Sequence, residues 1–268
     1  MPKRIPVPPQ KRLKIRPFPF VIRNAENPKV SVIIPAMNER KTIASVIKQA
    51  FQVHPETEVI VIANGSTDGT AEIAQKIGAR VIRFPKALGQ DTGRSIGAAE
   101  AKGDILLFTD ADIVIKTKDY AALTKAVEHG VDVALNKYLG PTGKTHVHNV
   151  VLAKHVLNIL VSNPDLKGAS LTSIPHAMSR HARDLIGTDN LAVPPKAQAI
   201  AIYKGLHVRS VHEIDVGRSN RKRGRSRRND PVEALIVGDH LEALDWFISQ
   251  SGERGGRSDH TRNRESMW

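Results

Sequence analysis

The sequence predicts an α/β fold in which a mainly parallel central sheet carries helices on both faces. Between residues 30 and 112, short apolar runs alternate with segments of helical periodicity. Short polar or glycine-containing connections separate the two kinds of segment. This alternation is typical of parallel strands joined by helical crossovers.

The first strand is expected in the apolar run that starts at Val30 and is closed by Pro35. A helical pattern follows from Lys41 to Phe51. A second apolar run, residues 58–63, ends in the polar sequence Asn-Gly-Ser-Thr-Asp-Gly-Thr at residues 64–70. We therefore predict a second strand followed by a turn.

In that turn Thr67 or Asp68 can cap the next helix, which has Ile73 and Ile77 on one face and stops at Gly78. A short strand at residues 79–84, a glycine-containing loop and a helix from about residue 94 to residue 102 complete the series. The last predicted strand begins at Asp104.

That last strand ends in two carboxylates, Asp110 and Asp112, separated by one residue. Side chains alternate along a strand, so both should point the same way at the C-terminal edge of the sheet, where α/β proteins bind ligands. Hard oxygen ligands there suit Mg²⁺ or Mn²⁺ and leave positions for a diphosphate. An isolated Asp-Ala-Asp could also merely cap a strand and start a turn, but the strand ends upstream favour the metal site.

Three segments together resemble the family 2 glycosyltransferases, which have the GT-A fold. They are Val-Ile-Ile-Pro-Ala-Met-Asn-Glu at 32–39, Asn-Gly-Ser-Thr-Asp-Gly-Thr at 64–70 and Ala-Lys-Gly-Asp-Ile-Leu-Leu-Phe-Thr-Asp-Ala-Asp at 101–112. Each lies at a predicted strand end. The resemblance covers residues 28 to 140 well and the remainder only loosely.

The resemblance implies a transferase that uses a nucleoside diphosphate sugar and Mn²⁺ or Mg²⁺. Asp112 would be the principal metal ligand, Asp110 with Ala111 would lie near the ribose and metal, and Arg94 would approach the diphosphate. Relatives usually carry acidic residues before the Gly-Ser, where this chain has Ala63-Asn64; an asparagine amide can still pair with uracil, so UDP is expected. The implied nucleotide pocket comprises Pro35, Ala36, Asn38 and Glu39, with Asn64, Gly65 and Ser66 at the base.

On the acceptor side, the resemblance makes His176 and Arg180 candidates for lining the acceptor pocket. The family's usual acidic base has no counterpart in residues 190–199, which contain no carboxylate. Asp189 is the nearest acid and Asp239, on the last predicted helix, is the other candidate for deprotonating the acceptor hydroxyl.

The missing acid leaves a second mechanism open. The segment 210–223 resembles the strand and basic loop of retaining GT-A enzymes such as the glucosyl-3-phosphoglycerate synthases. His212 would then be a third metal ligand, and Arg218 or Arg221 would clamp phosphate. The acceptor would be a saccharide, a lipid-linked molecule or a small molecule.

The composition of the 268 residues agrees with one large core and gives further expectations. No apolar run approaches the ~20 residues that span a bilayer, no signal peptide is apparent and there is no cysteine, so we expect a cytoplasmic protein. The net charge of +13 is concentrated in residues 1–23 and in 218–228, where seven of eleven residues are basic. Such runs are usually solvated loops, but they could contact diphosphate or anionic lipid. With 4% aromatic residues, nucleic acid is the least expected partner.

The expected organisation is a basic, proline-rich arm at 1–27, a GT-A domain at 28–250 and a disordered tail at 251–268. Within the domain, residues 28–140 would bind the nucleotide sugar and residues 141–250 the acceptor. Two other classes of protein fit the sequence less well. Nucleotidyltransferases normally have a glycine-rich loop after the first strand, which is absent here, and a non-catalytic polyanion-binding protein would leave the Asp-Ala-Asp sequence unexplained.

Overall fold

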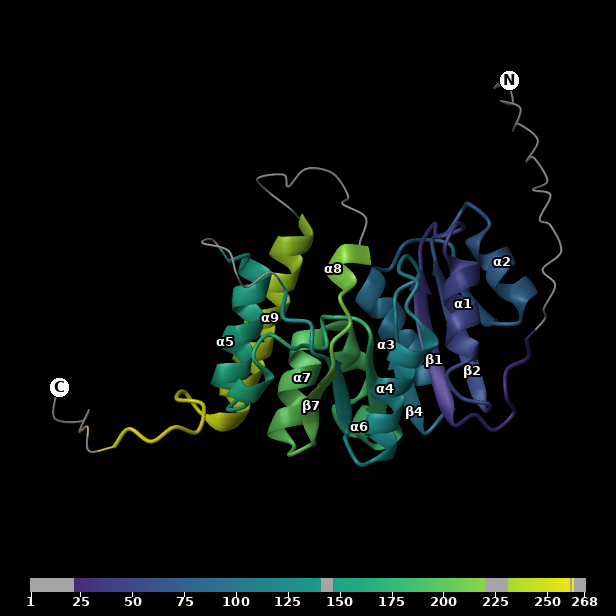
Figure 1. Ribbon diagram of the computed structural model, residues 1–268. Coiled ribbons are helices and arrows are strands. Elements are labelled where there is room, and N and C mark those ends of the chain that lie inside the picture. The colour runs from purple at the N-terminus through teal and green to yellow at the C-terminus, as the bar shows by residue number, and fades with distance from the viewer. Residues whose placement is uncertain (1–21, 141–146, 220–230, 261, 263–268) are drawn as a thin grey trace, which may run out of the picture.

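The structure, a computed structural model, describes residues 22–140, 147–219, 231–260 and 262. In that part of the chain, one seven-stranded sheet runs through the molecule in the order β3-β2-β1-β4-β6-β5-β7 (Figure 1). The strands are β1 (Val30–Ala36), β2 (Thr57–Asn64), β3 (Arg80–Phe84), β4 (Ile105–Phe108), β5 (Val133–Asn136), β6 (His176–Ser179) and β7 (Val208–His212).

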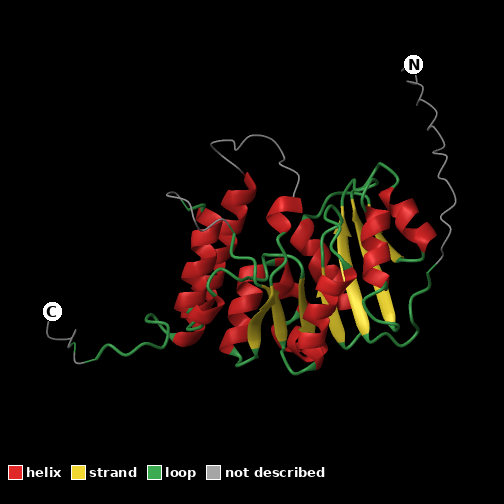
Figure 2. Cartoon of the chain, in the orientation of Figure 1, coloured by secondary structure: helices red, strands yellow, loops and turns green. Residues whose placement is uncertain are grey.

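Helices cover both faces of the sheet (Figure 2). One core packs the sheet against α1, α2 and α4, and the other packs it against α3, α6 and α7. Helices α5 and α9 form an outer pair that packs on α7. The helices are α1 (Ile43–Phe51), α2 (Thr70–Ile77), α3 (Gln90–Glu100), α4 (Thr117–Glu128), α5 (Asn149–Leu160), α6 (Arg180–Ile186), α7 (Pro194–Tyr203), α8 (Val216–Ser219) and α9 (Pro231–Ser251), with 3-10 turns η1 (Pro164–Leu166) and η2 (Thr188–Ala192).

The predicted α/β class with a mainly parallel sheet is confirmed. Strands β3, β2, β1 and β4 are parallel to one another, and β5 is parallel to β7. Strand β1 shows why its sequence is continuously apolar: Val32 and Ile34 enter one core while Ile33, between them, enters the other. The exception is β6, which lies antiparallel between β4 and β5.

Two helix starts differ from the sequence prediction. Helix α3 begins at Gln90 rather than near residue 94, so Asp91 and Arg94 lie on its first turns. Helix α2 begins after Gly69, whose φ of 94° is left-handed, and the Asp68 carboxylate accepts a hydrogen bond from the Thr70 N–H at 3.0 Å. Of the two predicted caps, Asp68 therefore satisfies a free N–H of the first turn.

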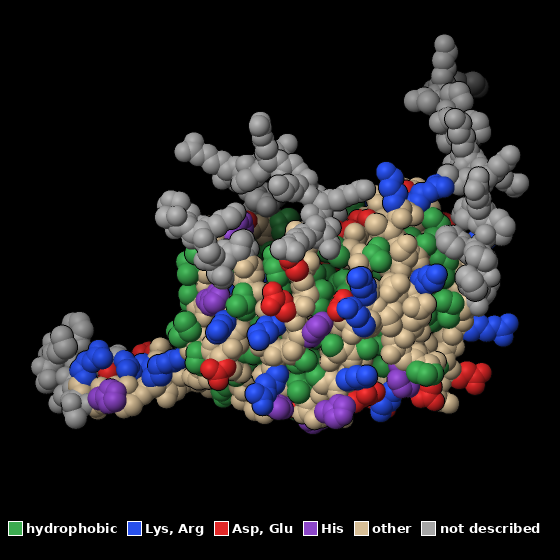
Figure 3. Space-filling view, viewed as in Figure 1, with side chains coloured by type: hydrophobic (Ala, Val, Ile, Leu, Met, Phe, Trp, Pro, Cys, Tyr) green, Lys and Arg blue, Asp and Glu red, His purple; other side chains and the backbone are tan. Residues whose placement is uncertain are grey.

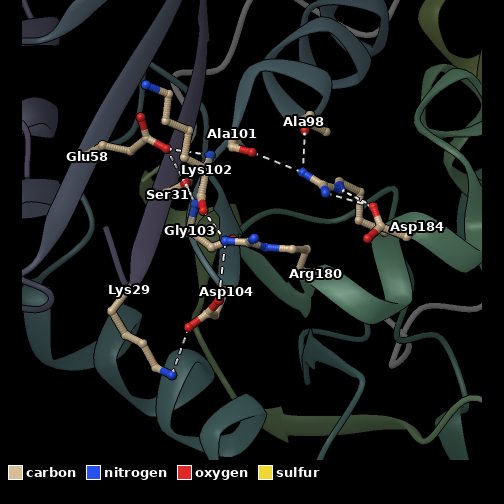
Figure 4. Close-up of polar contacts among 11 residues, drawn as sticks. Lys29, Ser31, Glu58, Ala98, Ala101, Lys102, Gly103, Asp104, Arg180 and Asp184 are labelled. Atoms are coloured by element: carbon tan, nitrogen blue, oxygen red, sulfur yellow. Dashed lines mark hydrogen bonds and ion pairs between the residues drawn. The ribbon is translucent and has the colours of Figure 1, made fainter. Parts of the chain in front are cut away.

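A buried polar network fixes the start of β4 (Figure 4). Glu58 Oε1 accepts hydrogen bonds from Ser31 Oγ at 2.5 Å and from the Lys102 N–H at 2.7 Å. Ser31 Oγ accepts a further bond from the Gly103 N–H at 2.7 Å, and a Cβ on Gly103 would lie 2.7 Å from Ser31 N. The register of β4 against β1 is thus set at one end, and this determines where Asp110 leaves the sheet.

Several sequence predictions fall outside the described residues: the basic arm up to residue 21, the basic run from residue 220 onward and the final residues 263–268. The last part of the predicted arm does pack on the domain, because Ile22 donates its N–H to Ile77 O and Asn24 bonds the backbone of Val59. Within the described ranges, no helix combines the length and the apolar character needed to cross a bilayer.

Candidate active site

The candidate site lies beside β1, where successive strands of the chain change from one side of β1 to the other. From β1 the chain moves to β2 on one side, whereas β4 returns to the other side of β1. The loops that leave β1 and β4 therefore diverge and open a crevice at the C-terminal edge, which is the usual ligand position in open α/β sheets. The segments after Ala36 and after Phe108 border this crevice.

A pocket of about 570 Å³ occupies this edge. This volume is in the range of small-molecule and cofactor sites. Its lining combines three carboxylates with basic and hydroxyl groups, which suits a charged ligand with an attached cation. Its lining residues are Asn38, Glu39, Arg40, Lys41, Thr42, Asp68 and Asp112.

Asn38 and Ser66 lock the loops after β1 and β2 together. The Asn38 N–H donates to Ser66 Oγ at 3.2 Å, and Asn38 Oδ1 accepts from the Thr67 N–H at 2.9 Å. Ser66 Oγ also donates to Ala36 O at 3.1 Å. Asn38 has a φ of 58°, a left-handed conformation that asparagine tolerates better than most residues. Both residues thus shape one wall of the pocket.

Asn64 anchors a neighbouring loop. Its Oδ1 accepts from the Leu88 N–H at 2.5 Å and its Nδ2 donates to Gly89 O at 2.7 Å, so the amide anchors the loop after β3. Asn64 is 4% exposed. Gly65, with φ of 69°, lies so close to this loop that a Cβ would be 2.8 Å from Ala87 N. The two residues position the loop after β3, and the Asn64 amide keeps one further N–H and one further acceptor position.

Arg94 is buried between two carboxylates. Its guanidinium lies 2.6 Å from Asp91 Oδ1 and 2.9 Å from Asp110 Oδ1, and its side chain is 6% exposed. Burial raises the pKa of Asp91; Arg94 opposes this effect and the Asp110 charge adds to it. The Nε of Arg94 is buried without a hydrogen-bond partner among the described residues. The structure brings Arg94 and Asp110 together as an ion pair.

Asp110 and Asp112 do not share one direction. Strand β4 ends at Phe108, two residues before Asp110, so strict alternation no longer applies. Asp110 faces Arg94, whereas Asp112 lines the 570 Å³ pocket. Within the described ranges, no group of three or more His, Asp or Glu residues is arranged to hold a metal ion.

His176 lies at the predicted edge, behind Arg94. Its ring stacks on Phe108 with centroids 4.9 Å apart, and Nδ1 lies 3.1 Å from Ser173 O. Burial, reinforced by the nearby Arg94 charge, lowers the pKa of His176 to about 3. The imidazole is therefore neutral at physiological pH and serves as packing beneath the ion pair.

Arg180 lies at the opposite edge of the sheet. Because β6 is antiparallel to β4, His176 pairs with Phe108 but Ser179 pairs with Ile105, at the other end of the strand. Arg180 follows there, donating from Nε to Gly103 O at 3.2 Å and pairing with Asp104 at 3.2 Å (Figure 4). It lines a separate pocket of about 350 Å³. The structure does not bring Arg180 to the candidate site.

The residues of the retaining alternative are only partly described. His212 Nε2 lies 3.0 Å from Asp119 Oδ1 on α4, so in this structure the imidazole pairs with that carboxylate. Arg218 belongs to the short helix α8, but its side chain is outside the described structure, as is all of Arg221.

The two candidate bases differ in their surroundings. Asp239 on α9 has a pKa raised to about 6, mainly by burial and further by the charges of Asp91 and Glu242. Asp189, in η2, is exposed. Asp239 is therefore the candidate whose pKa is shifted towards neutrality.

Sequence reasoning missed Asp91 and the pocket residues Arg40, Lys41 and Thr42. A signal existed for Asp91: it lies three residues before Arg94, and this spacing places both on one side of a helix. Arg40 and Lys41 follow the recognised Asn-Glu dipeptide directly, but the pattern does not show that they face the pocket.

Comparison with known proteins agrees with this architecture. The model of the family described as glycosyl transferase family 2 matches residues 31–166. The chain is 34% identical over 115 residues to 4,4'-diaponeurosporenoate glycosyltransferase of Staphylococcus haemolyticus, covering 41% of this chain and 28% of that protein. It is 33% identical over 123 residues to dolichol-phosphate mannosyltransferase of Pyrococcus furiosus, covering 43% and 35%. The match thus spans about a third of the length of these relatives.

A solved structure shares the fold over most of the chain. Glucosyl-3-phosphoglycerate synthase from Mycobacterium tuberculosis, in complex with Mn²⁺, UDP and phosphoglyceric acid, superposes with a TM-score of 0.59. The match covers 87% of this chain and 80% of that chain at 22% identity. With the family model matching half of the chain and its strand-end motifs at one edge of a GT-A-like sheet, the chain belongs to glycosyl transferase family 2.

Proposed function

We propose that the protein transfers a sugar from a nucleoside diphosphate sugar, with UDP as the favoured nucleotide, to an acceptor hydroxyl. The observation that carries this proposal is the 570 Å³ pocket, in which Asp112 and Asp68 face Arg40 and Lys41 at the switch point of the sheet. The pocket has the position, size and charged groups that a sugar diphosphate requires. The structural neighbours named with bound UDP support the choice of nucleotide.

The residues present fit a divalent cation that binds together with the diphosphate. Mg²⁺ is commonly held by one or two carboxylates plus substrate phosphates, so a complete protein cage is not required. Asp112 would hold it, and neighbours named with Mn²⁺ or Mg²⁺ support this assignment. When bound, the cation stabilises the charge that develops on the leaving diphosphate.

The ion-paired cluster of Arg94, Asp91 and Asp110 would also favour binding of a cation at this site. Arg94 holds Asp110 in place, and one arginine between two carboxylates leaves the cluster with a net negative charge. That charge favours a cation in front of Asp110. Arg94 would therefore act mainly by positioning Asp110, with Nε as its remaining donor.

We assign the acceptor base to Asp239, which makes the proposed reaction inverting. A base with pKa near 6 is ionised at neutral pH yet basic enough to accept a proton from a hydroxyl in the transition state. Asp189 remains the second candidate but is exposed. The acceptor would be a saccharide, a lipid-linked molecule or a small molecule; a peripheral contact with anionic membrane would fit the lipid-linked case.

Asp239→Asn is expected to lower kcat by about 10²- to 10⁴-fold, the usual contribution of general base catalysis, while UDP affinity changes little. In the unaltered enzyme, kcat should rise with pH through about 6, because the carboxylate must lose its proton to act. Steady-state rates between pH 5 and 8 test this. Asp245→Asn, an exposed acid on the same helix, is the matched control and should retain the wild-type profile. An unchanged kcat in Asp239→Asn would assign the base elsewhere or favour the retaining mechanism.

The retaining mechanism of the glucosyl-3-phosphoglycerate synthase type is the second candidate, because the shared fold extends over 87% of the chain. His212 would then have to leave Asp119 to reach a metal. A non-catalytic polyanion-binding role has less support: on the face shown in Figure 3, Lys and Arg side chains are interspersed with Asp and Glu.

Thermal unfolding with UDP, GDP, ADP or CMP, each with and without Mn²⁺, tests the proposed function. A ligand that binds only the native state raises the melting temperature. We expect stabilisation by UDP with Mn²⁺ and little by Mn²⁺ alone, since no protein cage is present among the described residues. If no nucleotide shifts the melting temperature, the proposal is wrong and polyanion binding becomes the better explanation.

A further inference from the structure

A buried lysine on α5, Lys154, has no carboxylate partner among the described residues. Lys154 lies on α5, and although part of its side chain reaches the surface, its ammonium group is buried. Nζ donates to Ser173 Oγ at 2.7 Å, and no carboxylate of the described residues pairs with it. Lysines usually do the reverse: they cover apolar surface with the stem and keep the ammonium in water.

The buried ammonium has an energetic cost that the hydroxyl of Ser173 offsets only in part. Burial alone lowers the pKa of Lys154 to about 8, with no neighbouring anion acting against it. At neutral pH the group still carries a charge, with two of its three donor positions not accounted for by described protein groups. Buried charges are normally paired, so this arrangement is incomplete without an anion.

The surroundings of Lys154 connect it to the acceptor side of the site. Ser173, its hydroxyl partner, accepts through its carbonyl from His176, which lies beneath Arg94. His240, next to Asp239 on α9, is close enough to Lys154 that the ammonium charge lowers its pKa. Thr172, beside Ser173, is partly exposed, so solvent reaches this segment.

His240 adds a second polar atom without a partner. Its Nδ1 lies 2.7 Å from Ile236 O and therefore carries the proton, because a carbonyl can only accept. Burial lowers the pKa of His240 to about 4, so Nε2 keeps a lone pair, and this atom is buried with no hydrogen-bond partner among the described residues. A protonated oxygen of a bound phosphate or a hydroxyl could donate to it.

We infer that Lys154, with Ser173 and His240, forms a subsite for a phosphate group of the acceptor. The inference rests on the proposed function, because it names the acceptor class of that site: a molecule with a hydroxyl for Asp239 and a phosphate for Lys154. An ammonium, a hydroxyl donor and an acceptor nitrogen suit a phosphate monoester, which offers charged oxygens and, in part, a proton. A free phosphate ester and a lipid-linked phosphate share this chemistry.

The test compares Lys154→Met with the unaltered protein. Isothermal titration with inorganic phosphate, against potassium chloride of equal ionic strength, should show at least about tenfold weaker binding in the variant, since charge-assisted hydrogen bonds are lost. Lys204→Met is the matched control, because that lysine also donates to one oxygen, Leu185 O at 2.6 Å, but at the surface. Equal phosphate affinity in all three proteins would overturn the subsite.

Stability provides an independent readout. Methionine has a similar shape without the buried charge, so Lys154→Met should melt at the same or a higher temperature than the unaltered protein when no ligand is present. A role confined to bonding Ser173 predicts a lower melting temperature with unchanged phosphate affinity, and that result would contradict the inference. Lys154→Arg, which keeps the charge, should retain most of the phosphate affinity.

The titrations are run with and without UDP and Mn²⁺, so that two failures can be told apart. If UDP and Mn²⁺ have no effect on any of the proteins, the proposed donor site is wrong. The difference in phosphate affinity between Lys154→Met and the unaltered protein then tests the subsite by itself. Titration with glycerol 3-phosphate and with farnesyl phosphate then distinguishes a free phosphate ester from a lipid-linked phosphate as the acceptor. Lys154-dependent binding of either one supports the subsite, and absence of such binding for both counts against it.

Discussion

Asp112→Asn is expected to abolish metal-dependent UDP binding without unfolding the protein. The amide keeps the shape of the side chain but removes the charge that would hold the cation at the pocket wall. With UDP at about 100 times its Kd, the unaltered protein should gain about 2.7 kcal/mol, or roughly 5–10 °C in melting temperature. The variant should show almost none of this shift, and its kcat should fall by about 10²- to 10³-fold.

Asp104→Asn is the control for this substitution. Asp104 precedes the same strand at its other end, where it pairs with Lys29 and Arg180 on the surface. It should keep the full UDP and Mn²⁺ shift. A normal metal-dependent shift in Asp112→Asn would show that the cation, if one binds, is held by other groups.

Arg94→Met is expected to have the largest effect on stability. It leaves Asp91 and Asp110 facing each other in a largely buried position without the cation between them. Breaking a buried ion pair by removing one partner typically costs about 3–5 kcal/mol. Chemical denaturation at pH 7.5 measures this, with Arg83→Met as the control, because its exposed pair with Glu72 should contribute less than about 1 kcal/mol.

The loss in Arg94→Met should shrink at acidic pH. Burial already raises the pKa of Asp91, and losing the opposing Arg94 charge raises it further, so the penalty is absent at low pH and grows as pH rises through the folded pKa. A deficit at pH 4.5 well below that at pH 7.5 is therefore expected. A deficit independent of pH would mean that lost packing, rather than unpaired charge, destabilises the variant.

Local sequence signals were sufficient for much of this architecture. The continuous apolar runs identified β1, β2 and β4 because both faces of each strand are buried. The strand-end motifs likewise predicted which loops would meet at the C-terminal edge. These features depend on neighbours within a few residues, and such neighbours are visible in one sequence.

The sequence did not show the features that depend on long-range packing. Nothing local indicates that β6 runs antiparallel, and this direction carries Arg180 to the far edge. The contacts of Asn64 with Leu88 and Gly89 were not visible in the sequence because these partners are in a loop 24 and 25 residues away. The ammonium group of Lys154 is buried because Ser173 and α9 pack against α5. The hydrophobic periodicity of the sequence does not show this packing.

The position of β6 has a consequence for how the chain can be divided. Strand β5 pairs only with β6 and β7 among the described strands, and both follow it in the sequence. A fragment ending near residue 140 would leave β5 without a partner and would expose the edge of β4 that β6 covers. Open strand edges recruit other chains, so such a fragment should aggregate rather than fold as a nucleotide-binding module. During synthesis, the sheet likewise cannot close until the residues of β6 have emerged.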